Sequence, residues 1–488
     1  MSTPETTPES TPETTPESAP ESAPESAPES ESAPGGTSEG ELGAFGYRQE
    51  LKRGLSLRDL LVYGLVFMVP IAPFSIFGAV FNASSGMVPL VYLIGFVAMI
   101  FTALSYREMS RAFPIAGSVY SYAGRGIHPA AGFLAGWAIL LDYLLVPTLL
   151  YVVGAAAFAS VLPAVPQWLW VVAFVLLNTT VNLRGIDTTA RANKVFLYGQ
   201  LLVLALFVVL AVVAISRGVN GAHWTATPFF NPALFSPSLV FGALSIAVLS
   251  FLGFDAISTM AEETRGGSRV VGRATVLSLG IVAVLFAVQT YLGALMLPGQ
   301  AAFDGETATN EAFYTVASLV GGTWFKVVVA VAVAIGSAIA NALVAQAATS
   351  RLLFSMARDR QLPAFLAHVN QTRRVPERAV LLVSVVSLIL ALFFVGQIQL
   401  LSSLVNFGAL FSFLLLHVSV FVWYVLRRRE RTFGLHLVVP ACGFVIIGYV
   451  LWNADAHAKI GGGVWLLIGC AVLLVFRLTG RSTDLKVS

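Results

Sequence analysis

Long apolar runs, which recur from residue 57 to residue 478, constrain this chain more than any other feature. A helix needs about 20 mainly apolar residues to cross the roughly 30 Å hydrocarbon core of a bilayer, and these runs have that length. Lipid offers no hydrogen bonds, so only helices or closed barrels can span it, and barrel strands alternate in polarity over about ten residues. Only 11% of the residues are charged, against about a quarter in soluble domains. The sequence therefore predicts an all-α membrane protein.

Twelve membrane spans account for both the apolar runs and the positive charge. With the N-terminus in the cytoplasm, the inner segments hold 26 of the 29 Lys and Arg residues, and only Arg217, Lys326 and Lys459 fall at the outer side. A missed or added span would destroy this alternation, because cytoplasmic loops carry the excess of basic residues. Both termini are therefore predicted to be cytoplasmic. The predicted spans are 57–83, 88–106, 128–160, 167–184, 191–216, 237–260, 273–297, 323–350, 378–395, 399–426, 436–453 and 463–479.

The first 46 residues differ in kind from the rest. Glu recurs at every fourth position from Glu5 to Glu29, each time preceded by Pro. Pro at this spacing forbids a continuous helix, and the segment has almost nothing apolar to bury. It also lacks the charged start and apolar core of a signal peptide. We expect a disordered acidic cytoplasmic tail over 1–46, a transporter domain over 47–479 and a short cytoplasmic tail over 480–488.

The sequence lacks the motifs of ATP-driven pumps and of metal-dependent membrane enzymes. No Lys is followed by Ser or Thr, so the phosphate-binding loop of an ATP-driven pump does not occur. There is no HExxH or CxxC, the six histidines are scattered, and Cys442 and Cys470 have no metal-binding spacing. Gradient-driven transport fits best, and we expect no enzyme activity, cofactor, metal or nucleic-acid partner. Arg outnumbers Lys 24 to 5 with abundant Ala and Val, which favours a bacterial plasma membrane.

The first span is interrupted by two prolines, Pro70 and Pro73, in the middle of its apolar run. Each proline removes a backbone donor and clashes with a preceding carbonyl. A simple kink is one interpretation. Unwinding is the other, and unwound segments at mid-membrane are where secondary transporters bind their solutes.

The sixth span contains a second candidate interruption at Gly253, followed by a carboxylate at Asp255. Glycine permits unusual backbone angles, and a buried acid in a membrane is costly unless it is paired, hydrated or functional. Asp255 could cap the helix that restarts after the break, bind a ligand, or do both. Phe251 and Phe254 could stack on an ammonium group, although packing is the commoner role of a membrane Phe.

Two further acidic positions stand out. Asp142 and Tyr143 lie in the middle of the third span, where an acid should face the interior and a hydroxyl suits a hydrated pocket. An internal hydrogen bond to a neighbouring helix is the alternative. Glu262 and Glu263 lie at the inner end of span six, near Arg265 and Arg269. Glu262 and Glu263 could form surface ion pairs with these arginines, or they could form an inner gate, and the sequence leaves both interpretations.

Several stretches together resemble the amino acid–polyamine–organocation (APC) superfamily of secondary transporters. The resemblance covers residues 50–478 and implies a five-plus-five inverted repeat with broken helices 1 and 6, two additional helices, and alternating access without a bound cofactor. The two interruptions are five spans apart, as that repeat requires. The stretches are Tyr106-Arg107-Glu108, 113–120 (FPIAGSVY), 182–185 (NLRG), 250–255 (SFLGFD) with 262–264 (EET), and 350–353 (SRLL) with Arg358-Asp359 and Leu362-Pro363.

Within the superfamily, residues 136–143 (GWAILLDY) and 405–410 (VNFGAL) resemble bacterial putrescine importers, which implies proton-coupled uptake. Those importers carry an aspartate in span one where this chain has Ser75. An amino acid, a monoamine or a modified polyamine therefore stays open as substrate. Many amino-acid members carry a lysine midway along span five, where this chain has Gln200, as the putrescine-like branch does. The lysine-based coupling scheme cannot be carried over, and Asp142, Asp255 and Glu262 are the candidate proton carriers.

The leading interpretation is a proton-coupled importer of an amine or amino acid. An exchanger is the alternative within carriers, and a nutrient sensor built on the transporter fold is a third interpretation. The protein is expected to be a monomer or a homodimer in membrane lipid. The predicted substrate-binding residues are Val69, Pro70, Ile71, Ala72, Ser75, Asp142, Tyr143, Phe251, Gly253, Phe254 and Asp255. The candidates for gating or proton coupling are Glu108, Gln200, Glu262 and Glu263.

Overall fold

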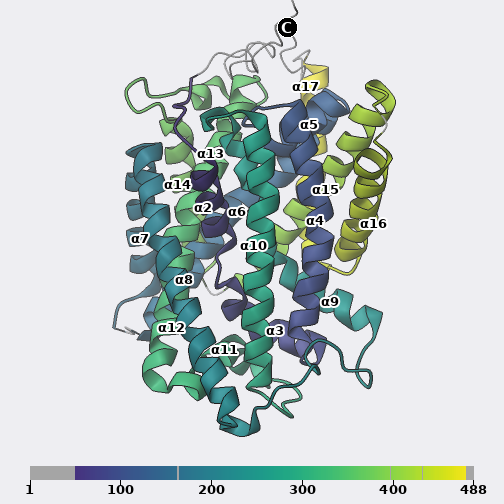
Figure 1. The fold of residues 1–488 in the computed structure, drawn as a ribbon. Helices are drawn as coiled ribbons and strands as arrows, with labels where there is room; N and C mark the ends of the chain where they lie inside the picture. The colour runs from purple at the N-terminus through teal and green to yellow at the C-terminus, as the bar shows by residue number, and fades with distance from the viewer. Residues whose placement is uncertain (1–49, 162–163, 396, 431, 455, 480–488) are drawn as a thin grey trace, which may run out of the picture. The chain divides into compact units, whose positions relative to one another are not determined.

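The computed structural model describes residues 50–161, 164–395, 397–430, 432–454 and 456–479. The predicted tails, 1–46 and 480–488, lie outside the described residues. The described part is built from helices, and its β-pairing is limited to one isolated bridge between Leu55 and Thr264 (Figure 1). The prediction of an all-α chain is confirmed for these residues.

The helices of the first half run from α2 to η3. They are α2 (Leu57–Met68), α3 (Ala72–Ser84), α4 (Val88–Ala112), α5 (Ser118–Gly126), α6 (Pro129–Val161), α7 (Gln167–Leu183), α8 (Ile186–Ser216), η1 (Val219–Gly221), α9 (Pro237–Ala247), and the 3-10 helices η2 (Val248–Phe251) and η3 (Asp255–Glu263).

The helices of the second half run from α10 to α17. They are α10 (Ser268–Leu295), α11 (Gly305–Gly321), α12 (Thr323–Ile335), the π-helix η4 (Gly336–Asn341), α13 (Ala342–Arg358), η5 (Ala364–Ala367), α14 (Glu377–Phe393), α15 (Ile398–Val420), the π-helices η6 (Phe421–Arg427) and η7 (Gly434–Val438), α16 (Val439–Trp452) and α17 (Ala456–Leu478).

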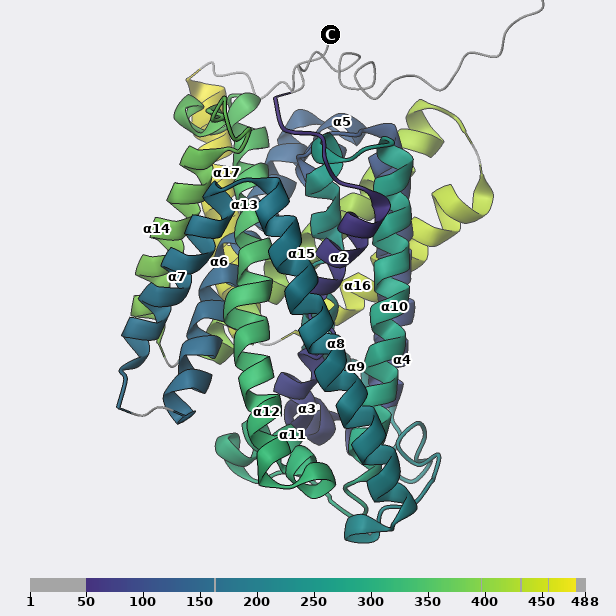
Figure 2. The same ribbon diagram turned by 60° about the vertical axis from the view of Figure 1, so that its left-hand side comes forward.

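Nine helices of the described residues are long and apolar enough to cross a membrane, and ten if the bent pair α2–α3 is one span. Long helices such as α4, α8 and α10 run along the length of the bundle (Figure 2). The remaining two predicted spans, 167–184 and 378–395, correspond to α7 and α14. Each of these helices has 17 residues, slightly fewer than the roughly 20 that a perpendicular span requires. A multi-pass membrane protein is therefore established, while the count of twelve stays a prediction.

Several helix boundaries differ from the predicted spans. The largest shifts are at α13, which ends at Arg358, α17, which begins at Ala456, and α4, which ends at Ala112. Apolar runs mark the part of a helix within the hydrocarbon, whereas the backbone continues helical into polar flanking residues. The apolar pattern also did not indicate the short helices α5 and α11, which lie at opposite ends of the helices in Figure 1.

The first span is broken, as the two prolines predict. Helix α2 ends at Met68 and α3 begins at Ala72, with a bend of 42° between them. Val69 between them has a φ of 51° and a ψ of 100°, outside helical values. The interruption follows from Pro70 and Pro73, which cannot donate to carbonyls of the preceding turn.

The sixth span is also broken where predicted. The 3-10 helix η2 ends at Phe251 and η3 begins at Asp255. Gly253 between them has a φ of 117°, a value that residues with a side chain rarely adopt. The expectation that glycine provides an unusual backbone angle here is confirmed.

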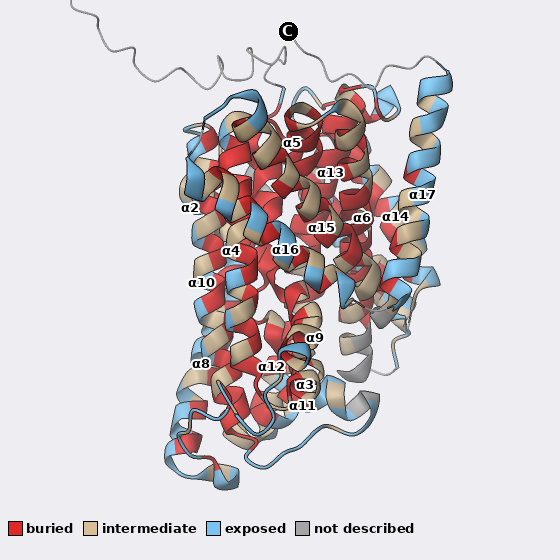
Figure 3. Cartoon of the chain, turned by 90° about the vertical axis from the view of Figure 1, so that its right-hand side faces the viewer, coloured by how far each residue is buried: buried red, intermediate tan, exposed pale blue. Residues whose placement is uncertain are grey.

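The interior of the bundle is formed by helices that carry the breaks and by α6 and α13. Burial falls towards α16 and α17 at the periphery (Figure 3). Of the most apolar window of each span, 83% is buried in α6 but only 11% in α17. In the interior, the π-helix η4 frees backbone carbonyls, and the Asn178 amide of α7 donates to Ala338 O at 3.0 Å. We therefore expect a solute site in the interior of the bundle.

Candidate functional site

A carboxylate, a phenol and a threonine join three helices at the centre of the described bundle. The Tyr143 hydroxyl of α6 donates to Asp255 Oδ2 at 2.6 Å, and the Thr349 hydroxyl of α13 donates to Tyr143 O at 2.6 Å. Asp255 is 1% exposed and Tyr143 is 2% exposed. Tyr143 therefore holds the carboxylate at the start of η3 in a fixed place, and the predicted residues of spans three and six do lie together.

Asp142 places a second carboxylate in the same region. It is 3% exposed and interacts electrostatically with Asp255. Its side chain has no hydrogen-bond partner among the described residues, whereas Asp255 has two. The α6 backbone here packs closely on α15, because a Cβ at Gly408 would lie 2.9 Å from Asp142 N. Neither carboxylate has an ion-pair partner within the part of the chain that the structure describes.

The Asp255 carboxylate accepts a backbone N–H of the interrupted segment and not one from the first turn of η3. Gly253 N donates to Asp255 Oδ1 at 3.1 Å, and Phe254 occupies the cap position of η3 without a side-chain bond. The N–H that Asp255 accepts thus precedes it in sequence, instead of lying two or three residues after it. The expected cap is replaced by a loop closed around Gly253.

Gly253, in the second break, packs directly against the side chain of Phe67, just before the first break. A Cβ built at Gly253 would collide with the Phe67 ring at the end of α2. This close approach, together with the positive φ, makes glycine a requirement at this position.

Gly253→Ala is therefore expected to lower stability by about 1–3 kcal/mol through backbone strain alone, and to reduce transport as Phe67 is displaced. Gly242→Ala is the matched control, because Gly242 lies in the helix α9 and a methyl group added there would have no neighbouring atom within 4 Å. Unfolding in mixed micelles and uptake in proteoliposomes would measure both variants. Equal behaviour of the two variants would contradict this role of Gly253.

Few backbone donors are left free at the first break. Pro70 and Pro73 have no N–H, and the N–H groups of Ala72 and Phe74 close turns onto preceding carbonyls at 2.7 and 3.0 Å. The Pro70 carbonyl accepts a hydrogen bond at 2.9 Å from Gln289 of α10. Sequence reasoning missed Gln289, although a fully buried glutamine in a membrane helix is a signal for such a role.

The two phenylalanines beside the second break are buried among other aromatic rings. Phe251 lies edge-on to Phe286 at 5.2 Å between centroids, and Phe254 lies edge-on to Tyr106 at 6.0 Å. Both are 0% exposed, so packing describes their contacts here, and a role in binding an ammonium group stays a prediction. Ser75 is half-buried on α3, one turn beyond the break.

Glu262 and Glu263, at the end of η3, form buried ion pairs with α13. Arg358 Nη2 lies 2.6 Å from Glu262 Oε1, and Arg351 donates from both Nε and Nη2 to the Glu263 carboxylate. The expected pairing with Arg265 and Arg269 at the surface is therefore wrong. Those arginines are near in sequence, but the end of η3 turns inward, where its carboxylates must find cations on the packed neighbouring helix.

The chain before α2 is fastened to the same end of η3. Gly54 N and Leu55 N both donate to Glu263 O at 3.0 Å, and Arg265 N donates to Leu55 O at 2.8 Å. The Glu262 carboxylate also accepts the Ala116 N–H at 3.1 Å. These contacts link η3 to α13, to the segment just before α5 and to the segment before α2. We call this set of contacts, centred on Glu262, Glu263, Arg351 and Arg358, the inner ion-pair cluster.

The other two coupling candidates lie elsewhere. Glu108 of α4 contacts Arg107 at 2.9 Å and Arg111 at 3.4 Å, at the same end of the bundle as α5. Gln200 of α8 faces Gly336 in a cavity between α8 and α12. Roles of Glu108 and Gln200 in coupling stay predictions. Among the described residues, no three His, Cys, Asp or Glu side chains gather as a metal site would require.

Comparison with known proteins decides the family. The chain matches the profile of the family described as "Amino acid permease" over residues 60–476. It belongs to this family, within the APC superfamily. The resemblance seen in the sequence motifs is thereby confirmed, and the protein is a transporter and not an enzyme.

Curated relatives extend over almost the whole permease. The low-affinity putrescine importer PlaP of Escherichia coli (strain K12) is 32% identical over 432 residues, which cover 87% of this chain and 94% of the relative. The branched-chain amino acid permease BcaP of Lactococcus lactis subsp. cremoris (strain MG1363) is 28% identical, covering 86% and 94%. A methylthioribose transporter of Bacillus subtilis (strain 168) is 25% identical, covering 88% and 94%. These relatives differ widely in named substrate, so the residues of the site must carry any argument about what this permease transports.

Proposed function

We propose that this permease imports a small amine across the bacterial plasma membrane by alternating access, with twelve spans, both termini cytoplasmic and protons as the coupling ion. Its site comprises Asp142, Tyr143, Asp255 and the two helix breaks at 69–72 and 251–254. The observation that carries the proposal is the pair of buried carboxylates, Asp142 and Asp255, at 3% and 1% exposure.

Charge is the first argument for an amine. Asp142 and Asp255 interact with each other and have no Lys, Arg or His ion-pair partner in the described part of the chain. Buried charges in a membrane are expensive unless they are compensated, and an ammonium group from a solute provides that compensation. Tyr143 keeps Asp255 in place, while the Asp142 carboxylate accepts no hydrogen bond from the residues that the structure describes.

The scarcity of free backbone N–H groups at the helix breaks is the second argument for an amine without a carboxylate. An amino-acid carboxylate would need free N–H groups at the start of a half-helix. At the first break the two prolines have none, and at the second the Gly253 N–H is already bonded to Asp255. A solute with positive charge and no carboxylate meets fewer conflicts here than an amino acid does. The putrescine importer among the relatives is consistent with this preference.

The inner ion-pair cluster supports an alternating-access cycle. In the conformation described, η3 is joined to α13 through the ion pairs of Glu262 and Glu263, at the end of the bundle that we predict to be cytoplasmic. Inward opening would have to separate these partners. A carboxylate that releases the solute and accepts a proton, Asp142 or Asp255, would couple the two movements.

Uptake of labelled putrescine into proteoliposomes, with and without an inward proton gradient, tests this function. We expect uptake that saturates and that the gradient accelerates several-fold. A proton ionophore should abolish the acceleration and leave the vesicles intact. Absence of any putrescine uptake by folded protein would contradict the proposal.

A second candidate is an amino-acid permease or an exchanger, and the relationship to the branched-chain permease supports it. Vesicles preloaded with unlabelled amine or amino acid distinguish exchange from import. A requirement for internal substrate would establish the exchanger, whereas equal uptake into empty vesicles would support the importer.

A further inference from the structure

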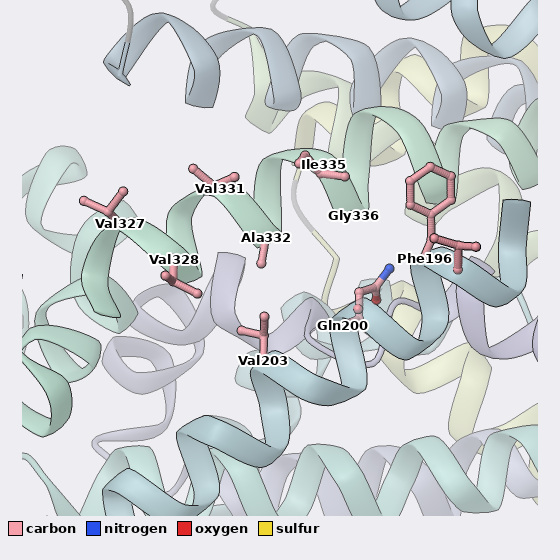
Figure 4. A pocket seen from close by; sticks show the side chains of 11 residues that line it. Phe196, Gln200, Val203, Val327, Val328, Val331, Ala332, Ile335 and Gly336 are labelled. Atoms are coloured by element: carbon pink, nitrogen blue, oxygen red, sulfur yellow. The ribbon is translucent and has the colours of Figure 1, made fainter. Parts of the chain in front are cut away.

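A cavity of about 470 Å³ lies between α8 and α12, and its walls contain none of the residues that contact Asp142 or Asp255. Sites for small molecules in proteins have volumes of about 300–1,000 Å³. Apart from Gln200, the side chains of its wall are apolar (Figure 4). The lining residues are Val195, Phe196, Gly199, Gln200, Val203, Val327, Val328, Val331, Ala332, Ile335 and Gly336.

Gln200 is buried in this cavity with its amide unused. The residue is 4% exposed, and neither its Nε2 nor its Oε1 has a hydrogen-bond partner among the described residues. Figure 4 shows its side chain extending from α8 toward Gly336 on the facing helix. A Cβ at position 336 would lie 3.4 Å from Gln200 Nε2, so glycine leaves the amide uncovered. A buried amide without partners is costly, so this position calls for a group that both donates and accepts.

The cavity opens sideways, toward the lipid. Val195 of α8 is 67% exposed and Val327 of α12 is 48% exposed, and both belong to helices apolar enough to span a membrane. A molecule that reaches Gln200 by this route comes from the hydrocarbon layer, where ions are strongly disfavoured. The occupant is therefore neutral, with a long apolar body.

We propose that this cavity is a binding site for a neutral amphipathic molecule from the bilayer, namely a long-chain alcohol whose hydroxyl group bonds Gln200 and whose chain lies along the valines of α8 and α12. A hydroxyl group donates and accepts, so one hydroxyl can bond the amide oxygen or nitrogen of Gln200. The acyl chain of a phospholipid would fill the same walls but leave the amide unpaired. This proposal concerns a site separate from the transport site and does not depend on the identity of the transported solute.

Photolabelling of the full-length protein in phospholipid vesicles tests the proposal. The probe is a long-chain primary alcohol with a diazirine in its chain, and its comparison probe is the same chain without the hydroxyl group. We expect adducts of the alcohol within 195–203 and 327–336, at a yield about tenfold above that of the hydrocarbon probe, as one hydrogen bond to a buried amide would give. An excess of unlabelled alcohol should remove these adducts.

Three variants complete the test. Gln200→Leu keeps the volume and removes an unpaired polar group, so the protein should fold, and alcohol labelling should fall about tenfold to the level of the hydrocarbon probe. Ala332→Phe should fill the cavity and remove labelling by both probes. Leu202 is 70% exposed and does not line the cavity, so Leu202→Ala should leave labelling by both probes unchanged. Three results would overturn the proposal: equal labelling by the two probes, alcohol labelling that Gln200→Leu does not change, or adducts found only in other segments. Equal labelling would indicate a groove that binds acyl chains.

Discussion

Asp255→Asn is expected to reduce amine binding and uptake by at least about thirtyfold. Removing one charge from a buried, hydrogen-bonded charge pair typically costs about 2–5 kcal/mol of binding free energy. Asparagine keeps the size of the side chain, and it can accept the Gly253 N–H at its oxygen while its NH2 group donates to the Tyr143 hydroxyl oxygen, in place of the two bonds that Asp255 accepts. The loss should therefore come from charge and not from misfolding. Equilibrium binding of labelled putrescine to purified protein, together with its thermal stability, would measure the two effects separately.

Two control variants sharpen this expectation. Asp304→Asn makes the same chemical change at an exposed position outside the site, and it should leave binding unchanged. Tyr143→Phe removes the hydroxyl that positions Asp255 while keeping both charges, so its effect should be smaller than that of Asp255→Asn. Normal putrescine affinity in Asp255→Asn would show that this carboxylate does not bind the amine.

Glu263→Gln should destabilise the protein by about 3–5 kcal/mol, because it leaves the Arg351 guanidinium buried without its partner charge. The side chains of Glu263 and Arg351 are 2% and 5% exposed. Replacing both, as Glu263→Gln with Arg351→Met, should restore much of the loss, since the unpaired charge is then removed. The free energy of unfolding in mixed micelles measures each single variant and the pair.

The exposed pair Glu311–Lys326 provides a matched comparison. Its charged atoms are 3.4 Å apart, and the Glu and Lys side chains are 52% and 40% exposed. Glu311→Gln should therefore change stability by less than about 1 kcal/mol. If Glu263→Gln costs no more than Glu311→Gln, the inner ion-pair cluster does not hold η3 against α13 as described.

The breaks of the two central helices could be predicted because their causes are local. Pro70 and Pro73 remove backbone donors wherever they are placed in a helix, and Gly253 is the residue that tolerates a φ of 117°. The family was predictable for a similar reason, since its motifs are short and continuous in the sequence. The closeness of Asp142, Tyr143 and Asp255 followed from placing acids of a membrane protein in its interior.

Contacts that depend on helix rotation and packing could not be predicted. Arg351 lies 88 residues from Glu263, and nothing in the sequence favoured it over Arg265, which is two residues away. Gln289 and Thr349 likewise reach backbone carbonyls of other helices at 2.9 and 2.6 Å. The short helix α5 was missed because it does not cross the membrane and so produces no long apolar run.

Competition between putrescine and ornithine for binding to the purified protein tests the central claim most directly. Ornithine is putrescine with a carboxylate on the carbon that bears one amine, so the pair isolates the effect of that one group. The two buried carboxylates and the engaged N–H groups of Ala72, Phe74 and Gly253 predict that putrescine binds and that ornithine competes at least about tenfold more weakly. Stronger binding of ornithine, or of neutral amino acids, would contradict the account and indicate that the permease recognises an amino-acid carboxylate.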